Sequence, residues 1–379
     1  MAEYDLQWPP MPETLIPLKR ISPSRAVALH SCALCVVWSA QQFPPTLPIS
    51  PMARFGIIVH RLLCESGEGR LRPPTRVLVE RRLSELIIED DRVAAASWLQ
   101  RRFSPIANHI HDIEVQRICA IERALELAAH ARSSTGRGSQ SSKTGFEVWV
   151  QNREGTAGGY IDEVRIENGN ITIVDQKTGS IFEIATDLAQ ASIKKDYITQ
   201  LKLYAALYHE TWNEWPHHAL LLPLRGKPWE IPIEADNCSR ILEDTLKLFK
   251  ATNDIILSTR NHAEGQQRLA NPSPPACHFC VYRPKCHKYI DIVEQADFAT
   301  EWPHDLWGPL TNIRMLENQT ISLTIGTKRI RGLFESKHPA LNSLQPGDKI
   351  AVFNLRRTAS PFSFDSADLT TIYRLKENP

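Results

Sequence analysis

The chain has 379 residues, which is enough to bury a full hydrophobic core and favours one large domain and one small one. Its 44 lysines and arginines balance 43 aspartates and glutamates to a formal net charge of +1. This balance excludes a globally basic nucleic-acid binder, so any contact with nucleic acid must come from local patches.

The N-terminal third predicts several helices. Ser22 is a suitable N-cap with Pro23 in the first helical position, and this helix is expected to run through Cys32 towards Trp38. A second helix is expected over residues 56–65. Residues 81–133 indicate two or three more, the last over 115–131.

The middle of the chain predicts strands, with a first strand at 147–150. Residues 160–166 and 171–176 form a hairpin around Asn168-Gly169, the strongest short hairpin signal. Alternation along the second strand places Asp175 on the face of Ile171 and Ile173, and Lys177 follows on that same face. Further strands are expected at 219–222 and 229–233, and further helices at 197–212 and 239–257.

The C-terminal part changes to short strands separated by turn residues, without a helical pattern. These strands are expected at 320–325, 329–334, 349–355 and 370–375. The pattern predicts a small β-barrel such as an OB-fold, a fold that commonly binds single strands or partner proteins. We therefore expect domains at 1–300 and 301–379.

The central hairpin carries the chemistry. Two carboxylates on neighbouring strands, Asp162 and Asp175, would attract a divalent cation, and hard oxygen ligands favour Mg²⁺ or Mn²⁺. A lysine beside that ion, Lys177, can hold an attacking hydroxide or a phosphate oxygen, which is phosphodiester chemistry in outline. The alternative is a pair of solvated hairpin carboxylates with Lys177 as a surface partner.

Asp162 and Asp175-Gln176-Lys177 resemble the core of the PD-(D/E)XK nucleases, with a mixed central sheet flanked by helices, and the flanking segments resemble their RecB-like branch. Gly56 and His60 fit its Gly-x-x-x-His motif, and Gln200 and Tyr204 fit its Gln-x-x-x-Tyr helix. The resemblance covers roughly residues 22–288. It implies that Asp162, Asp175 and Lys177 are catalytic. It also implies a metal site of His60, Asp162, Asp175 and the Gln176 carbonyl, with Gln200 and Tyr204 at the DNA.

The hairpin departs from the family pattern. Glu163 stands where a basic residue is typical, which would leave an extra carboxylate near the site, and Gln176 replaces a tyrosine. His60 can also be read as an ordinary core histidine. Glu147 on the preceding strand could assist metal binding or form a structural salt bridge.

The eight cysteines argue against a disulfide framework in a chain of this kind and for a metal or cluster site. Cys277, Cys280 and Cys286 match the C-x2-C-x5-C tail of iron–sulfur members of the branch, and Cys32 would supply the fourth ligand, with Cys35 as a competitor. Four thiolates suit a 4Fe–4S cluster or Zn²⁺. The resemblance favours a structural iron–sulfur cluster.

The sequence thus favours a metal-dependent DNA nuclease that serves repair, recombination or defence against foreign DNA, as in AddB-type or CRISPR adaptation nucleases. A helicase or another defence or repair protein is a possible partner. The alternative is a non-catalytic subunit that recognises DNA ends or single strands for such a helicase. The chain has no apolar run long enough to span a bilayer, and residues 1–17 are unlike a signal peptide, so we expect a cytoplasmic protein with no membrane partner.

Overall fold

The computed structural model describes residues 14–133, 142–183, 192–295 and 301–375. They divide into two compact units. The core unit contains residues Ile16–Val36 and Pro51–Ser258. The barrel unit contains the described parts of Val37–Ser50 and Thr259–Pro379. None of the described helices combines the length and the apolar character needed to cross a membrane.

The core unit is built on a five-stranded mixed sheet in which the strand order follows the sequence. The strands are β1 (Gly145–Gln151), β2 (Gly158–Glu167), β3 (Asn170–Lys177), β4 (His218–Pro223) and β5 (Trp229–Ile231). Only β3 and β4 are parallel. The hairpin between β2 and β3 turns at Asn168 and Gly169, which both have positive φ, as a two-residue type I′ turn requires.

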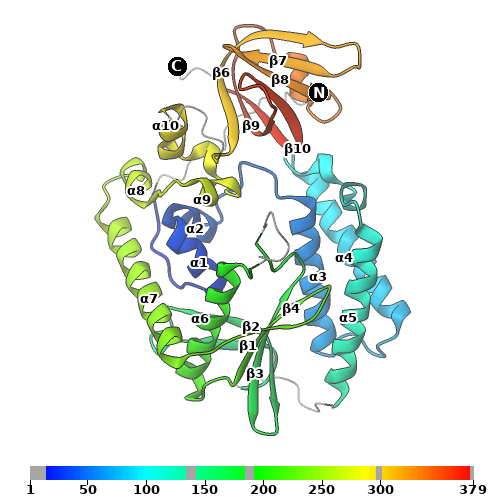
Figure 1. Ribbon diagram of the computed structural model, residues 1–379, viewed down its shortest axis with the longest axis vertical. Coiled ribbons are helices and arrows are strands. Elements are labelled where there is room, and N and C mark those ends of the chain that lie inside the picture. Colours follow the sequence, from blue (N-terminus) through cyan, green and yellow to red (C-terminus); the bar gives the residue numbers. More distant parts are fainter. Residues whose placement is uncertain (1–13, 134–141, 184–191, 296–300, 376–379) are drawn as a thin grey trace. The chain divides into compact units, whose positions relative to one another are not determined.

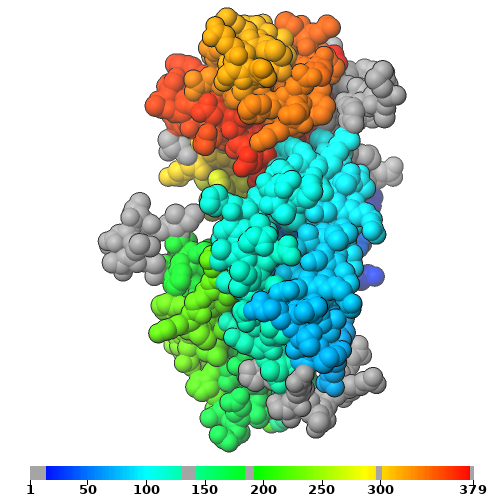
Figure 2. Space-filling model, turned by 90° about the vertical axis from the view of Figure 1, so that its right-hand side faces the viewer, coloured from blue at the N-terminus to red at the C-terminus, as the bar shows by residue number. Residues whose placement is uncertain are grey.

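Helices cover both faces of this sheet (Figure 1). The helices on one side are α3 (Pro51–Gly67), α4 (Arg76–Ala96) and α5 (Ile113–Ser133), and those on the other are α1 (Pro23–Ser31), α6 (Lys195–Trp212) and α7 (Ala235–Ser258). Two 3-10 turns, η1 (Arg101–Phe103) and η2 (Ile106–His109), join α4 to α5. The layer of α3, α4 and α5 packs around buried residues such as Phe55, Leu83 and Leu127, and Figure 2 shows its outer surface in blue and cyan.

The helix predicted to continue from Ser22 through Cys32 is interrupted. Ser22 caps α1 as expected, since its Oγ accepts a hydrogen bond from the backbone N–H of Arg25 at 3.4 Å. The prediction of one continuous helix is wrong because Cys32 is extended, with φ of −158°. A second helix, α2 (Ala33–Ala40), begins directly after it.

The barrel unit contains a closed five-stranded barrel, which confirms the small barrel predicted from the sequence. Its strands are β6 (His304–Met315), β7 (Ile321–Ile325), β8 (Lys328–Leu333), β9 (Lys349–Arg357) and β10 (Ser363–Arg374). The barrel is closed by antiparallel pairs and by one parallel pair between β8 and β10. Strand β6 is absent from the sequence-based expectation, although it pairs with both β7 and β9.

The segment that precedes the barrel is joined to it by a buried polar network. This segment contains α8 (His262–Leu269), α9 (Pro274–His278), η4 (Arg283–Lys285) and α10 (His287–Gln295), and η5 (Pro339–Ser343) lies within the barrel sequence. The guanidinium of Arg283 donates to both carboxylate oxygens of Asp305, at 2.6 and 3.0 Å, and to Asn354 Oδ1 at 2.6 Å. Tyr289 donates to the same carboxylate at 2.7 Å. Because Arg283 and Asp305 are each only 2% exposed, removing either partner would leave a buried charge uncompensated.

Candidate metal centre

Three carboxylates stand in a row across the first three strands of the core sheet. The pairs on either side of Glu147 in the β1–β2 ladder place it opposite Asp162. One step beyond the last pair of the β2–β3 ladder, Asp162 comes opposite Asp175. Glu147 has φ of +50°, a left-handed conformation that non-glycine residues rarely adopt and that proteins often retain at functional sites.

His60 joins this row from α3. Its Nε2 lies 3.0 Å from Oδ1 of Asp162. One helical turn earlier, Gly56 faces Thr178, just after β3, and a Cβ added at Gly56 would lie only 2.7 Å from Thr178 Oγ1. The glycine therefore lets α3 approach the end of β3, and the spacing of four residues then aims His60 at the carboxylates.

His60, Glu147 and Asp162 form a set of donors suited to a divalent cation. Their ligand atoms all lie within 4.8 Å of one another, and this is the one such group of three in the part of the chain that the structure describes. A small cavity of about 10 Å³ lies between them and Gln176, close to the room that one water molecule or small cation needs. Carboxylate oxygens with one imidazole nitrogen suit Mn²⁺ as well as Mg²⁺.

The surroundings of these groups raise the pKa of two of them, His60 and Glu147. The hydrogen bond to Asp162 is the largest cause that raises the pKa of His60, and burial opposes it. The pKa of Glu147 is raised chiefly by burial and next by the nearby charge of Asp162. Since both groups hold a proton more tightly than usual, a cation would have to compete with protons for the same place.

Asp175 is the most enclosed member of the row, with 3% of its surface exposed. Its Oδ1 accepts a hydrogen bond from Gln200 Nε2 at 3.1 Å. Its Oδ2 is sealed from solvent, and Lys177 Nζ lies 2.6 Å from it as an ion-pair partner. Burial, reinforced by Asp162 and opposed by Lys177, raises the pKa of Asp175 to about 6. A carboxylate this deeply buried favours positively charged partners, because burying a charge without compensation is costly.

Lys177 is held from three sides. Its ammonium contacts Asp175, donates to Gln200 Oε1 at 3.0 Å and lies 4.6 Å from the centre of the Tyr197 ring. Gln200 and Tyr197 both come from α6, so this helix fixes the lysine beside the carboxylates.

Tyr204 lies one turn after Gln200 on α6. It is 7% exposed, its ring lies against Gly159, and burial followed by the charges of Asp162 and Asp175 raises its pKa. The DNA contacts expected of Gln200 and Tyr204 stay predictions. So does the metal contact of the Gln176 carbonyl, although the backbone N–H of Gln176 donates to Asp162 Oδ2 at 2.7 Å.

Glu163 does not add a carboxylate to the site, so that expectation is wrong. Alternation along β2 directs it to the face opposite Asp162. There both of its oxygens accept hydrogen bonds from Arg165, at 2.7 and 2.8 Å. Arg165, two residues further along the same strand, thus supplies the basic group next to Glu163.

The cysteines are all without disulfides. Cys32 ends α1 in the core unit, whereas Cys277, Cys280 and Cys286 belong to the barrel unit. The guanidinium of Arg283 holds the turn of the last three, since it lies within 3.5 Å of the carbonyl oxygens of Cys277 and Cys280. The four-cysteine cluster stays a prediction.

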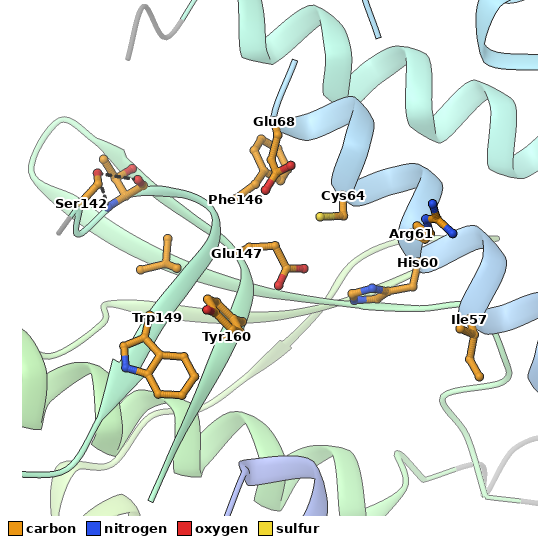
Figure 3. A pocket seen from close by; sticks show the side chains of 12 residues that line it. Ile57, His60, Arg61, Cys64, Glu68, Ser142, Phe146, Glu147, Trp149 and Tyr160 are labelled. Atoms are coloured by element: carbon orange, nitrogen blue, oxygen red, sulfur yellow. Dashed lines mark hydrogen bonds between the residues drawn. The ribbon is translucent and has the colours of Figure 1, made fainter. Parts of the chain in front are cut away.

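A larger hollow of about 660 Å³ opens beside the metal centre (Figure 3). Its lining includes His60, Cys64 and Glu147 together with two aromatic side chains, Trp149 and Tyr160. The sequence patterns left the role of Glu147 open and gave no role to these aromatic residues. Trp149 lies two residues after Glu147, and Tyr160 lies two residues before Asp162. Because alternate residues of a strand share one face, this spacing is the sequence signal that could have placed both aromatic residues at the site.

Comparison with known proteins gives one match. The family model of the PD-(D/E)XK nuclease superfamily matches residues 20–287, well over half of the chain. Neither the curated proteins nor the solved structures give a significant match.

Proposed function

Because the chain belongs to the PD-(D/E)XK nuclease superfamily, we propose that it is a metal-dependent nuclease that hydrolyses phosphodiester bonds in DNA. The observation that carries the proposal is the convergence of His60, Glu147 and Asp162 within 4.8 Å, directly beside the paired Asp175 and Lys177. An ordinary salt bridge on a solvated surface would not require buried carboxylates. It would also not require a histidine that reaches these carboxylates from a different helix.

The donor set fits the cation that such chemistry requires. His60, Glu147 and Asp162 would hold Mg²⁺ or Mn²⁺, and the buried carboxylate of Asp175 would offer a further ligand. When bound, such a cation supplies Lewis-acid chemistry, because it polarises a phosphoryl oxygen and helps a water molecule to lose a proton.

The side chains contribute positioning and charge. Lys177 would donate a hydrogen bond to the attacking water or to a non-bridging phosphate oxygen, and its charge would offset the negative charge that develops in the transition state. Because Asp175, Gln200 and Tyr197 already hold the ammonium, little reorganisation is needed when substrate arrives. Asp175 and Gln200 therefore position Lys177.

A cleavage assay tests the proposal. Linear and circular DNA, single- and double-stranded, would be incubated with the protein and Mn²⁺, Mg²⁺ or EDTA. We expect cleavage that requires the metal and is lost in Asp162→Asn. The matched control is Glu167→Gln, which changes an exposed carboxylate on the same strand and should cleave normally. Binding of DNA without cleavage under any of these conditions would favour a non-catalytic DNA-binding subunit instead.

The finer assignments rest on the resemblance of the sequence motifs. We propose a RecB-like enzyme that acts in DNA repair or in defence against foreign DNA, with a helicase as a possible partner. We also propose that Cys277, Cys280 and Cys286, with Cys32 as the fourth ligand, hold a structural 4Fe–4S cluster. Iron and sulfide analysis of anaerobically purified protein, with Cys280→Ser, tests this; zinc in place of iron would overturn it.

A further inference from the structure

A pair of aromatic side chains lies beside the row of carboxylates, on the same face of the sheet. Trp149 on β1 and Tyr160 on β2 are directly paired in the ladder. Their ring centroids lie 4.8 Å apart with an angle of 64° between the ring planes. Figure 3 shows both rings at the wall of the hollow, on the side of Glu147 that is away from His60.

The position of this pair is set by strand geometry. Trp149 lies two residues after Glu147, and Tyr160 lies two residues before Asp162, so all four side chains share one face of the sheet. Two residues along a strand span roughly 7 Å. A nucleotide next to a phosphate at the metal centre would therefore reach the aromatic pair.

The exposure of the pair distinguishes it from core aromatics. Tyr160 is 45% exposed, whereas Val148, Val150 and Ile161 on the opposite face of the same strands are at most 4% exposed. The hollow of about 660 Å³ is also ample for a flat ring. An exposed ring held at a cavity wall is the feature that base stacking uses.

The ring of Trp149 is held in place by polar neighbours. Its Nε1 donates to Gln151 Oε1 at 3.2 Å. The guanidinium of Arg20 lies 4.8 Å from the ring centre, and the Nε of Arg20 donates to the carbonyl oxygen of Gly155 at 3.0 Å. Arg20 itself is exposed, so this side of the pair offers a positive charge to a phosphodiester backbone.

We propose that Trp149 and Tyr160 form a stacking subsite for an unpaired base that flanks the phosphate at the metal centre. The substrate class that follows is single-stranded DNA or a frayed end, since bases within a duplex are stacked on each other and do not offer their faces. This inference rests on the proposed nuclease function for the role of the metal centre. Its test measures binding and is independent of cleavage.

The experiment compares two ligands with the same backbone charge: oligothymidylate and a chain of abasic sugar-phosphate units of equal length. Binding to the full protein is measured by fluorescence anisotropy in EDTA. Tyr160→Ala should weaken oligothymidylate binding by about 5- to 150-fold, the range reported by alanine substitution of stacking residues. Tyr160→Phe retains the ring and should remain within about twofold of the wild type.

Two comparisons make the result specific. The loss in Tyr160→Ala should disappear on the abasic chain, because that ligand has no base to stack. Tyr160→Leu, which retains apolar bulk without a flat ring, should behave like Tyr160→Ala. Trp229→Ala is the matched control, because Trp229 is 43% exposed on β5 of the same sheet and should leave binding unchanged.

The inference is overturned if Tyr160→Ala binds oligothymidylate as the wild type does. It is equally overturned if this substitution weakens the binding of oligothymidylate and of the abasic chain by the same factor. It is also overturned if the wild type binds the abasic chain as tightly as oligothymidylate. If the affinity loss depends on the base but the protein cleaves no DNA, the stacking subsite stands and the nuclease function is refuted. If the protein cleaves DNA but Tyr160→Ala causes no base-dependent loss of affinity, the nuclease function stands and the stacking subsite is refuted.

Discussion

Replacing Asp175 with asparagine should stabilise the protein while it removes the proposed activity. The substitution conserves shape and removes one buried negative charge. In the folded protein burial raises the pKa of this carboxyl from 3.8 to about 6, even with Lys177 beside it. The charged form is therefore less stable inside the protein than in water, and the neutral amide avoids that cost.

The magnitude follows from the difference between the two pKa values. A difference of about two pH units, at 1.36 kcal/mol per unit, corresponds to roughly 3 kcal/mol in the free energy of unfolding. The pKa of Asp175 is higher in the folded protein than in the unfolded chain, so a proton on this carboxyl contributes to the free energy of unfolding. This contribution is fully present below about pH 4 and is lost as the pH rises through about 6. Asp175→Asn should therefore equal the wild type near pH 4 and exceed it by up to about 3 kcal/mol near pH 8.

Urea unfolding in EDTA, followed by circular dichroism at several pH values, measures this difference. Adding Mn²⁺ should stabilise the wild type and narrow the gap, because the carboxylate would then have a metal partner in addition to Lys177. Asp254→Asn is the control, since Asp254 is an exposed carboxylate on α7 and should change stability by no more than about 0.5 kcal/mol at any pH. A variant less stable than the wild type near pH 8, or a gap that does not depend on pH, would show that burial does not disfavour the charged form of Asp175.

Three further substitutions test the roles of Lys177, Gly56 and Arg283. Lys177→Met should lower single-turnover cleavage by roughly 10²–10³-fold and leave Mn²⁺ binding in place, whereas normal cleavage would remove the lysine from the mechanism. Gly56→Ala should cost about 1–3 kcal/mol in urea unfolding, because its Cβ would lie 2.7 Å from Thr178 Oγ1, and adding Thr178→Ala should recover most of that loss. Arg283→Met should cost about 3–5 kcal/mol in urea unfolding by leaving the carboxylate of Asp305 buried without its partner, and a loss below 1 kcal/mol would show that the network adds little.

The parts of the fold that follow local rules were predictable. Asn168-Gly169 specifies a two-residue hairpin, and with it the pairing that brings Asp162 next to Asp175. Helix α6 also lies within two residues of its expected start and ends at its expected last residue, because its apolar positions repeat with helical spacing. These two elements alone place Lys177 between the hairpin and Gln200.

Features that depend on tertiary contacts were not predictable in the same way. Strand β6 contains Gly308, with φ of +144°, and Pro309, both poor strand residues, and its pairing with β7 and β9 overrides that local preference. The role of Glu147 depends on a left-handed backbone and on a register that brings it opposite Asp162. Neither property is visible in the residue types.

Anomalous diffraction from crystals grown with Mn²⁺ tests most directly whether His60, Glu147 and Asp162 hold the cation of a nuclease. We expect an anomalous peak between His60 Nε2 and the carboxylate oxygens of Glu147 and Asp162, and no such peak in crystals of Asp162→Asn. A manganese ion bound elsewhere, in a protein that still cleaves DNA, would show that these three residues are not its metal site.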